Sequence, residues 1–317
     1  YQLREAAPGQ LTMDTYGRPD QLYRNNGKNS AGQITFSDVS SDAGIEGVGH
    51  GLSATWWDYN GDRYPDLYVG NDFISPDRLY RNNGDGTFDE ILGSTLPYCS
   101  WSSMGAASAD FNNDGLLDFF SADMAATTHF AQKVNMGDMS KHRWLMENGW
   151  PRQIMRNMLY VNTGTDHFME TAWMSGVAQS DWTWAVKAAD FDSDGRVDLF
   201  LSNGMVRNFS DADIPINTGM LIGKTIWDIY KNTPPMPQKN LVFQNLGDLQ
   251  FKQASDWGLD QESMSYGSAF GDLDGDGDLD LVVMNLDEPV SIFRNEIASP
   301  NKAIFKLEGN QSNKSGI

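Results

Sequence analysis

The chain has 317 residues, more than a single hydrophobic core usually holds, so we expect either two domains or one large repetitive β-architecture. Its 31 glycines, 12% aromatic residues and 21% charged residues are typical of a folded protein, not a disordered one. The formal net charge of −20 argues against nucleic acid and against an anionic membrane surface as partners. Cys99 is the only cysteine, which excludes an internal disulfide.

Targeting and membrane signals are absent from the sequence as given. No apolar run approaches the roughly 18 residues of a membrane span, so we expect no membrane insertion. Tyr1 does not begin a signal peptide, and we expect an export signal to lie upstream or to have been removed.

The first predicted elements form a hairpin and then a complete repeat. Residues 21–39 contain QLYRNNG and ITFSDV, which predict two strands around a turn. The stretch that follows has LSATWW, an aspartate-rich loop, the strand LYVGN, then RLYRNN and TFDEI around a GDG turn. Asn-Asn-Gly-Asp-Gly between two apolar runs strongly predicts a hairpin.

Three further repeats follow, two of them interrupted. DFFSADM is separated from MLYVNTGTDHF by an interruption at 125–157, and LFLSNG is separated from NLVFQNLGDLQF by another at 204–238. The last repeat is GDLDGDGDLDLVVMN with VSIFRNE and AIFKLEG. Within the interruptions, KHRWLMEN and TIWDIYK predict one or two helical turns each.

In each repeat, the first strand is followed by a loop that resembles a calcium-binding loop. It offers carboxylates or an amide at positions 1, 3, 5 and 9, and a backbone carbonyl at position 7. We call these loop 1 (58–66), loop 2 (110–118), loop 3 (190–198) and loop 4 (272–280). Calcium takes six to eight oxygen ligands, and a glycine at position 6 permits the sharp turn around the ion. The predicted ligands are Asp58, Asn60, Asp62, Tyr64, Asp66, Asp110, Asn112, Asp114, Leu116, Asp118, Asp190, Asp192, Asp194, Arg196, Asp198, Asp272, Asp274, Asp276, Asp278 and Asp280.

The predicted cofactor is therefore Ca²⁺, about four ions at one per loop. The alternative is four acidic, solvated turns, in which the clustered carboxylates would repel one another. An EF-hand does not fit, because position 12 of loop 4 is Val283 and a strand follows instead of a helix. Arg63 replaces the glycine at position 6 of loop 1, which weakens the prediction of a metal there.

A repeat of about 50 residues with four antiparallel strands is the sequence form of a β-propeller blade. A β-helical nonapeptide repeat would recur every nine residues, and dockerin-like loops would be flanked by helices. We therefore predict an all-β fold, a β-propeller of four-stranded antiparallel blades. The chain accounts for about four and a half to five blades, with calcium-binding A–B loops and two partly helical B–C insertions.

The repeats resemble the FG-GAP/VCBS repeats of the integrin α-type propeller. The order of SMGAASADFNNDGLLDFF, NMLYVNTG, DWTWAVKAADFDSDG and KLEGNQSNKSGI is similar to bacterial members of the cartilage acidic protein family. This resemblance implies a secreted, calcium-binding, seven-bladed propeller whose molecular activity is poorly defined. It divides the chain into a propeller at 1–300 and, at 301–317, a last strand with the start of a truncated ASPIC/UnbV module.

Because the strands of a blade alternate in direction, the A–B loops lie on one face, and the insertions and D–A loops lie on the other. Exposed aromatic rings beside basic groups on this second face would stack on sugar rings or receive an acidic glycan or protein loop. The alternative is that these tryptophans plug the central funnel of the propeller or pack the insertions against it. The candidate ligand-binding residues are His50, Trp101, Asp181, Trp182, Trp144, Trp150 and Trp227.

Large apolar residues also recur six positions before each loop. They are Leu52, Met104, Trp184 and Tyr266, and a large apolar group in register predicts packing between blades.

No nucleophile elbow, P-loop, HExxH or cysteine–metal motif is present, so we expect no enzyme. The predicted function is an extracellular calcium-binding adhesion or ligand-binding module, secreted or at the cell surface, whose partner is a glycan or protein. A purely structural scaffold and a polysaccharide lyase or hydrolase acting through the insertion face remain alternatives.

Overall fold

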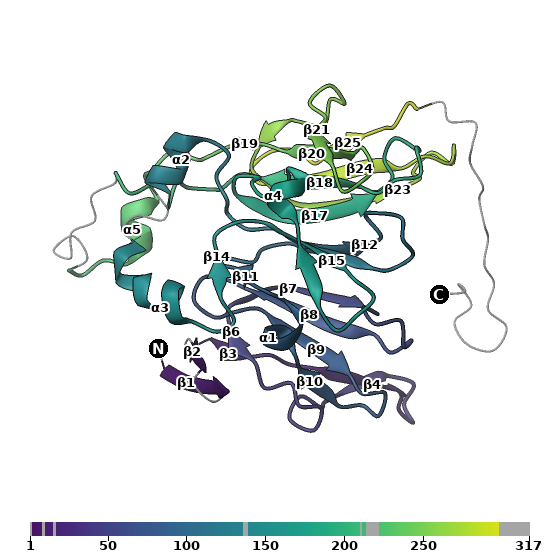
Figure 1. The fold of residues 1–317 in the computed structure, drawn as a ribbon. Coiled ribbons are helices and arrows are strands. Elements are labelled where there is room, and N and C mark those ends of the chain that lie inside the picture. Colours follow the sequence, from purple (N-terminus) through teal and green to yellow (C-terminus); the bar gives the residue numbers. More distant parts are fainter. Residues whose placement is uncertain are drawn as a thin grey trace.

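The computed structural model describes residues 2–7, 10–14, 17–135, 139–209, 211–213 and 222–297; of residues 2–14, 141, 226 and 229 it describes the backbone alone. Within these residues antiparallel sheets follow one another around a common axis, which confirms the predicted β-propeller (Figure 1). The predicted final strand and module start at 301–317 lie outside the described residues.

Three sheets have four strands each, hydrogen-bonded in chain order as a blade requires. Blade 1 consists of β7 (Gly51–Trp57), β8 (Asp66–Asn71), β9 (Arg78–Asn82) and β10 (Phe88–Glu90). Blade 2 consists of β12 (Ala106–Ala109), β13 (Asp118–Ser121), β15 (Met158–Asn162) and β16 (Phe168–Glu170). Blade 3 consists of β17 (Thr183–Ala189), β18 (Asp198–Asn203), β20 (Leu241–Asn245) and β21 (Phe251–Gln253).

Blade 4 has three described strands, and hairpins precede blade 1. The strands of blade 4 are β23 (Ser265–Gly271), β24 (Asp280–Asn285) and β25 (Ser291–Phe293). The hairpins are β1 (Gln2–Ala7) with β2 (Gln10–Asp14), and β4 (Tyr23–Lys28) with β5 (Ile34–Asp38). The second hairpin is the one predicted from QLYRNNG and ITFSDV.

The core lies between consecutive blades. The second strands β8, β13 and β18 are buried along their whole length, because both of their faces meet a neighbouring blade. Phe119 and Phe120 are adjacent in β13 and point to opposite faces of it. Phe119 packs with Trp57 and Tyr68 of blade 1, whereas Phe120 belongs to the cluster shared with blade 3.

Both interruptions are B–C connections, as predicted. The first holds α2 (His129–Val134), η1 (Met139–His142), α3 (Arg143–Asn148) and β14 (Gln153–Ile154); the second holds α5 (Ile226–Tyr230) and β19 (Gln238–Lys239). Figure 1 shows α2, α5 and α3 gathered at one edge of the molecule. We call these three helices the insertion shelf.

Short ladders and two short helices complete the D–A connections. The ladders pair β14 with β11 (Cys99–Ser100), β19 with β22 (Glu262–Ser263), and β3 (Arg18–Pro19) with β6 (Val48–Gly49). The helices are α1 (Leu92–Thr95) and α4 (Ala172–Ser175). None of the helices in the described part of the chain has the length and apolar character needed to cross a membrane.

Candidate metal centre and ligand face

Each A–B loop folds around the carboxylate of its first aspartate. In loop 2, Asp110 Oδ1 accepts the N–H of Asp114 at 3.1 Å, and Oδ2 accepts the N–H of Gly115 at 2.8 Å. The first aspartates of the other loops accept the equivalent pair of backbone N–H groups. One short side chain thus turns the chain back on itself, so all four loops share one backbone shape.

The turn needs a left-handed residue at position 6. The glycines there have positive φ, 88° at Gly115 and 90° at Gly277. Arg63 takes the same conformation with φ 72° and still donates its N–H to Asp58 Oδ2 at 2.9 Å. The departure at Arg63 therefore leaves the backbone of loop 1 intact, although a non-glycine residue there is strained.

The side chains at positions 3 and 5 bring oxygen atoms together. Three carboxylate oxygens lie within 4.8 Å of one another in loop 3 and again in loop 4, and these trios are Asp190, Asp192 and Asp194, and Asp272, Asp274 and Asp276. In loops 1 and 2 the third position is an asparagine, whose amide donates to the position 5 aspartate at 2.8 and 2.9 Å.

The aspartate at position 9 is buried and already holds the loop to strand C of its blade. Asp118 is fully buried; its Oδ2 accepts the N–H of Phe111 at 3.0 Å and its Oδ1 the N–H of Asn162 at 2.8 Å. Asp66, Asp198 and Asp280 repeat both bonds. Burial raises the pKa of Asp66 and Asp118 to about 6 and that of Asp198 to about 7.

The asparagine at the end of strand C joins neighbouring blades, a role that the sequence did not reveal. The Nδ2 group of Asn162 donates to Leu117 O at 3.2 Å in its own blade and to Tyr59 O at 2.7 Å in blade 1. Asn245 and Asn295 make the same two bonds, reaching back to Phe111 O and Phe191 O at 2.8 Å each. We call this repeated contact the asparagine clamp.

The loops suit a hard divalent cation. Carboxylate oxygens converge in loops 3 and 4, and oxygen donors of this type are the ligands that calcium prefers. In loop 3 one of these carboxylates already has a cationic partner, because the Arg196 guanidinium forms an ion pair with Asp194. Positions 1, 3 and 5 would hold the ion through side chains and position 7 through its carbonyl.

The predicted ligand residues on the opposite face fall into two groups, and the first group is buried. Trp101 is 1% exposed and packs with Ile74 and Leu145, and Trp182 is 8% exposed and packs with Met104 and Met124. The expectation that these two rings are exposed is therefore wrong. They pack the insertions against the propeller, which is the alternative that the sequence left open.

Asp181 also serves as an anchor. Its carboxylate accepts the N–H and the hydroxyl of Thr127 at 2.8 Å each, at the start of the first insertion. The neighbouring N–H of Trp182 donates to Gln238 Oε1 at 3.0 Å, at the end of the second insertion. The D–A connection of blade 3 thereby fixes one end of each insertion.

The second group of predicted residues is accessible. Trp144 on α3 is 44% exposed, Trp227 on α5 is 49% exposed, and His50 is also exposed. Trp150 is half-buried against α1, where a Cβ on Gly93 would lie 2.6 Å from its Nε1 atom. Sequence analysis missed Phe130 on α2, which is 70% exposed.

The two insertions contact each other. Val134 O, at the end of α2, accepts the N–H of Ala212 from the second insertion at 2.8 Å. Phe209 then reaches α5, with its ring centroid 6.4 Å from that of Trp227 and 5.1 Å from that of Tyr230. The end of α2 is therefore joined to the second insertion, whose Phe209 packs on α5.

Two buried carboxylates near the ends of the second strands were not predicted. Asp77 accepts hydrogen bonds from Tyr68, from Ser103 and from the N–H of Asn71 at 2.8 Å. Asp123 accepts the N–H of Trp101 at 2.8 Å. Burial raises the pKa of both groups to about 7.

The residues six positions before the loops behave as predicted in three repeats. Met104 is buried, and the Trp184 and Tyr266 rings stack across the boundary of blades 3 and 4 with centroids 4.7 Å apart. Leu52 is instead 48% exposed, so its predicted place in the core is wrong. It lines a hollow with Leu22 and Ile45 on the side of blade 1 where only a hairpin is described.

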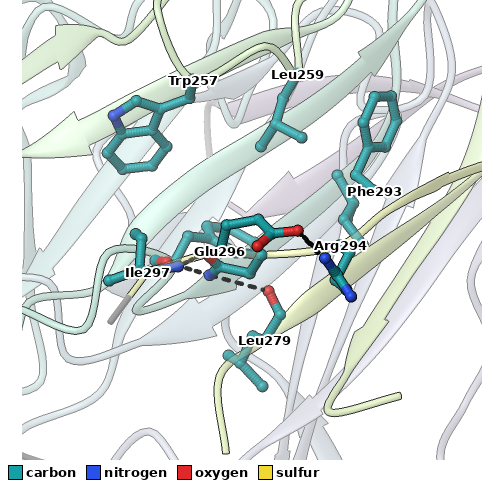
Figure 2. Close-up of a pocket in the computed structure, with 10 residues that line it drawn as sticks. Trp257, Leu259, Leu279, Phe293, Arg294, Glu296 and Ile297 are labelled. Carbon is teal, nitrogen blue, oxygen red and sulfur yellow. Dashed lines mark hydrogen bonds and ion pairs between the residues drawn. The ribbon is translucent and has the colours of Figure 1, made fainter. Parts of the chain in front are cut away.

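A largely apolar cavity of about 340 Å³ lies beside blade 4. Figure 2 shows Trp257, Leu259 and Phe293 among the residues that line it. Phe191, at position 2 of loop 3, also lines it. In loops 1 and 2 the residue at position 2 packs against a phenylalanine in the fourth strand of the following blade. The ring centroids of Tyr59 and Phe168 are 6.0 Å apart, and those of Phe111 and Phe251 are 6.1 Å apart. The cavity is thus part of an inter-blade seam.

Comparison with protein families agrees with the repeat pattern. The model of the FG-GAP-like repeat matches residues 58–121 and 228–283. Cartilage acidic protein 1 of Xenopus tropicalis is 26% identical over 270 residues, and that of Homo sapiens is 23% identical over 277 residues. These alignments cover 84% of this chain but 34% and 33% of the relatives, so the chain spans about a third of their length.

Among solved structures, the chain is similar to an Agrocybe aegerita lectin described for specific recognition of non-reducing terminal N-acetylglucosamine. The superposition covers 91% of this chain and 78% of the lectin, with 15% identity and a TM-score of 0.33. At this TM-score the likeness supports no conclusion about ligand.

Proposed function

Because this chain is an FG-GAP-repeat β-propeller of the cartilage acidic protein type, we propose that it is an extracellular, non-enzymatic module that binds calcium in its A–B loops and a glycan or protein on its insertion shelf. One observation carries the proposal: oxygen-rich loops and exposed aromatic side chains lie at opposite ends of the same blades. Calcium in the loops would stabilise the propeller, and the insertion shelf would bind the ligand.

Calcium would stabilise the blades, not take part in chemistry. An ion held by positions 1, 3 and 5 would relieve the repulsion among clustered carboxylates. It would also fix the loop whose position 2 carbonyl accepts the asparagine clamp of the next blade. Weak sites of this kind fill at the millimolar calcium concentrations found outside cells, which supports an extracellular setting.

Exposure and charge support binding on the insertion shelf. Long loops on a rigid scaffold commonly carry function, and the exposed rings of Trp144 and Trp227 offer stacking surfaces. Residues 125–157 and 204–238 contain eight Lys and Arg against five Asp and Glu, whereas the whole chain contains 23 against 43. The two insertions that carry the shelf are therefore less acidic than the rest of the chain, which favours an acidic partner there.

The calcium proposal is tested by elemental analysis of the purified chain and by thermal melting with and without excess chelator. Chelation should lower the melting temperature, since one site held at about 100 times its dissociation constant contributes about 2.7 kcal/mol. An unchanged melt together with no detected metal would overturn it.

The ligand proposal is tested on a glycan array and by co-purification from extracellular extracts. Trp144→Ala and Trp227→Ala should each weaken binding to any ligand found, whereas Trp173→Ala on α4, where the ring is 61% exposed, should not. Equal losses in all three variants would indicate nonspecific adhesion. Release of reducing ends or unsaturated products from a polysaccharide would instead establish an enzyme.

A further inference from the structure

Loop 3 differs from the other loops in carrying an arginine at position 7. The Arg196 guanidinium forms an ion pair with Asp194 Oδ2, and its Nε donates to Asn245 O at 2.8 Å. Both side chains are partly shielded, with exposed fractions of 37% for Arg196 and 24% for Asp194. The guanidinium is therefore held between the loop and the end of β20.

The oxygen that Arg196 contacts is the one that a metal would use. Asp194 Oδ1 already accepts the N–H of Arg196 at 2.9 Å, and Asp192 Oδ1 accepts the N–H of Asp194 at 3.2 Å. The Oδ2 atom of each carboxylate is left to coordinate an ion, but the Oδ2 atoms of Asp192 and Asp194 are both engaged by protein donors. Asp194 Oδ2 binds Arg196, and Asp192 Oδ2 accepts from Gln244 Nε2 at 2.6 Å.

The other loops carry no cation at position 7. Position 7 is Tyr64 in loop 1, Leu116 in loop 2 and Asp278 in loop 4, none of them cationic. Arg294 stands where Gln244 stands in blade 3, beside loop 4, but its guanidinium bonds Glu296. Arg81, at the same position of blade 1, bonds Asp89 at 2.9 Å.

We propose that Arg196 is a tethered counter-ion that competes with calcium for Asp194 and so lowers the calcium affinity of loop 3. This inference rests on the proposed calcium binding. Calcium must displace the guanidinium before Asp194 Oδ2 can coordinate it. In the absence of metal, the guanidinium neutralises part of the charge and keeps loop 3 folded.

The test is calcium titration of the full chain, followed by native mass spectrometry and calorimetry. Arg196→Met keeps the aliphatic stem, whose Cδ lies 3.7 Å from a Cβ built on Gly247, and removes the charge. It should tighten one calcium site by about tenfold or more, a change of about 1.4 kcal/mol in binding free energy. Arg196→Lys keeps the charge and should leave that affinity near the wild-type value.

Two controls separate direct competition from a general charge effect. Arg81→Met removes a cation at the equivalent position of blade 1 whose guanidinium bonds Asp89 on β10, so it should change calcium affinity much less. In an Asp194→Ala background, Arg196→Met should no longer tighten any site. Equal effects of Arg196→Met and Arg81→Met, or no effect of Arg196→Met while calcium still binds, would overturn the inference. A wild type that binds no calcium at all would instead overturn the proposed function.

Discussion

The side-chain amide of Asn162 donates a hydrogen bond of 2.7 Å to the backbone carbonyl of Tyr59, which lies 103 residues earlier in the preceding blade. Tyr59 is position 2 of loop 1, so the A–B loop of one blade is bonded to strand C of the next. The same bond recurs from Asn245 and from Asn295. Blade stacking and loop conformation are therefore coupled through one residue type.

Removing a clamp should destabilise the propeller. Asn162→Ala leaves the carbonyls of Tyr59 and Leu117 without this donor in a buried seam, and we expect a loss of about 2 kcal/mol in the free energy of unfolding, measured by urea denaturation. The matched control is Asn83→Ala, one residue beyond the end of β9 and exposed, which should cost about 0.5 kcal/mol or less. A similar loss of unfolding free energy in both variants would contradict a stabilising role of the asparagine clamp.

Arg63→Gly should stabilise the protein. Arg63 has φ 72°, a conformation that costs a non-glycine residue about 1–2 kcal/mol, of which the added flexibility of glycine in the unfolded chain cancels part. A net gain of about 0.5–1 kcal/mol in the free energy of unfolding is expected. Arg24→Gly, at a strand position without positive φ, should destabilise, and a gain there as well would show that the effect is not conformational.

The buried carboxyl of Asp77 should make stability fall as the pH rises. Burial raises its pKa from 3.8 to about 7, so its contribution is fully present below pH 3.8 and is lost as the pH rises through about 7. Between these values the folded state holds one more proton, a slope of up to about 1.4 kcal/mol per pH unit.

Asp77→Asn should therefore flatten the pH dependence relative to wild type, as measured by urea midpoints between pH 4 and pH 8. The difference between the two proteins at each pH removes the contribution that the other buried carboxyls make to the pH dependence of stability. An unchanged slope would show that Asp77 does not titrate in this range.

Two aspartates of loop 4 should respond differently to calcium. Asp274→Ala removes an exposed position 3 carboxylate, so the variant should show a smaller loss of melting temperature on chelation than wild type. Asp278 is 3% exposed and would supply only its carbonyl to an ion, so Asp278→Ala should lower the melting temperature by a similar amount with and without chelator. The opposite pattern would mean that the two positions have exchanged roles.

The fold could be predicted because its signals are local and repeated. Each aspartate loop runs directly into an apolar strand, and hairpin residues such as Asn82 and Gly84 mark the turn that follows. The positions of the two insertions followed from the same spacing. The asparagine clamp could not be predicted in this way, because Asn162 and Tyr59 meet only after two blades have stacked.

The ligand face was predicted less well for a related reason. An indole ring has the same chemistry whether it is buried or exposed, so the sequence could not separate Trp101 and Trp182 from Trp144 and Trp227. Leu52 is the opposite case. Its periodic position predicted burial between blades, but its side chain is exposed because the described part of the preceding chain does not cover it. The donors that engage loop 3, Arg196 and Gln244, depend on side-chain directions that no spacing encodes.

The anchoring of the insertions has a consequence for engineering. Asp181 holds Thr127 and Trp182 holds Gln238, so each insertion is tied to the neighbouring blade by bonds near one of its ends. The segment beyond such a tie adds no strand to the four-stranded blades. A foreign peptide grafted beyond Thr127, or before Gln238, would be displayed from a fixed root, and the molecule offers two adjacent sites for such exchange.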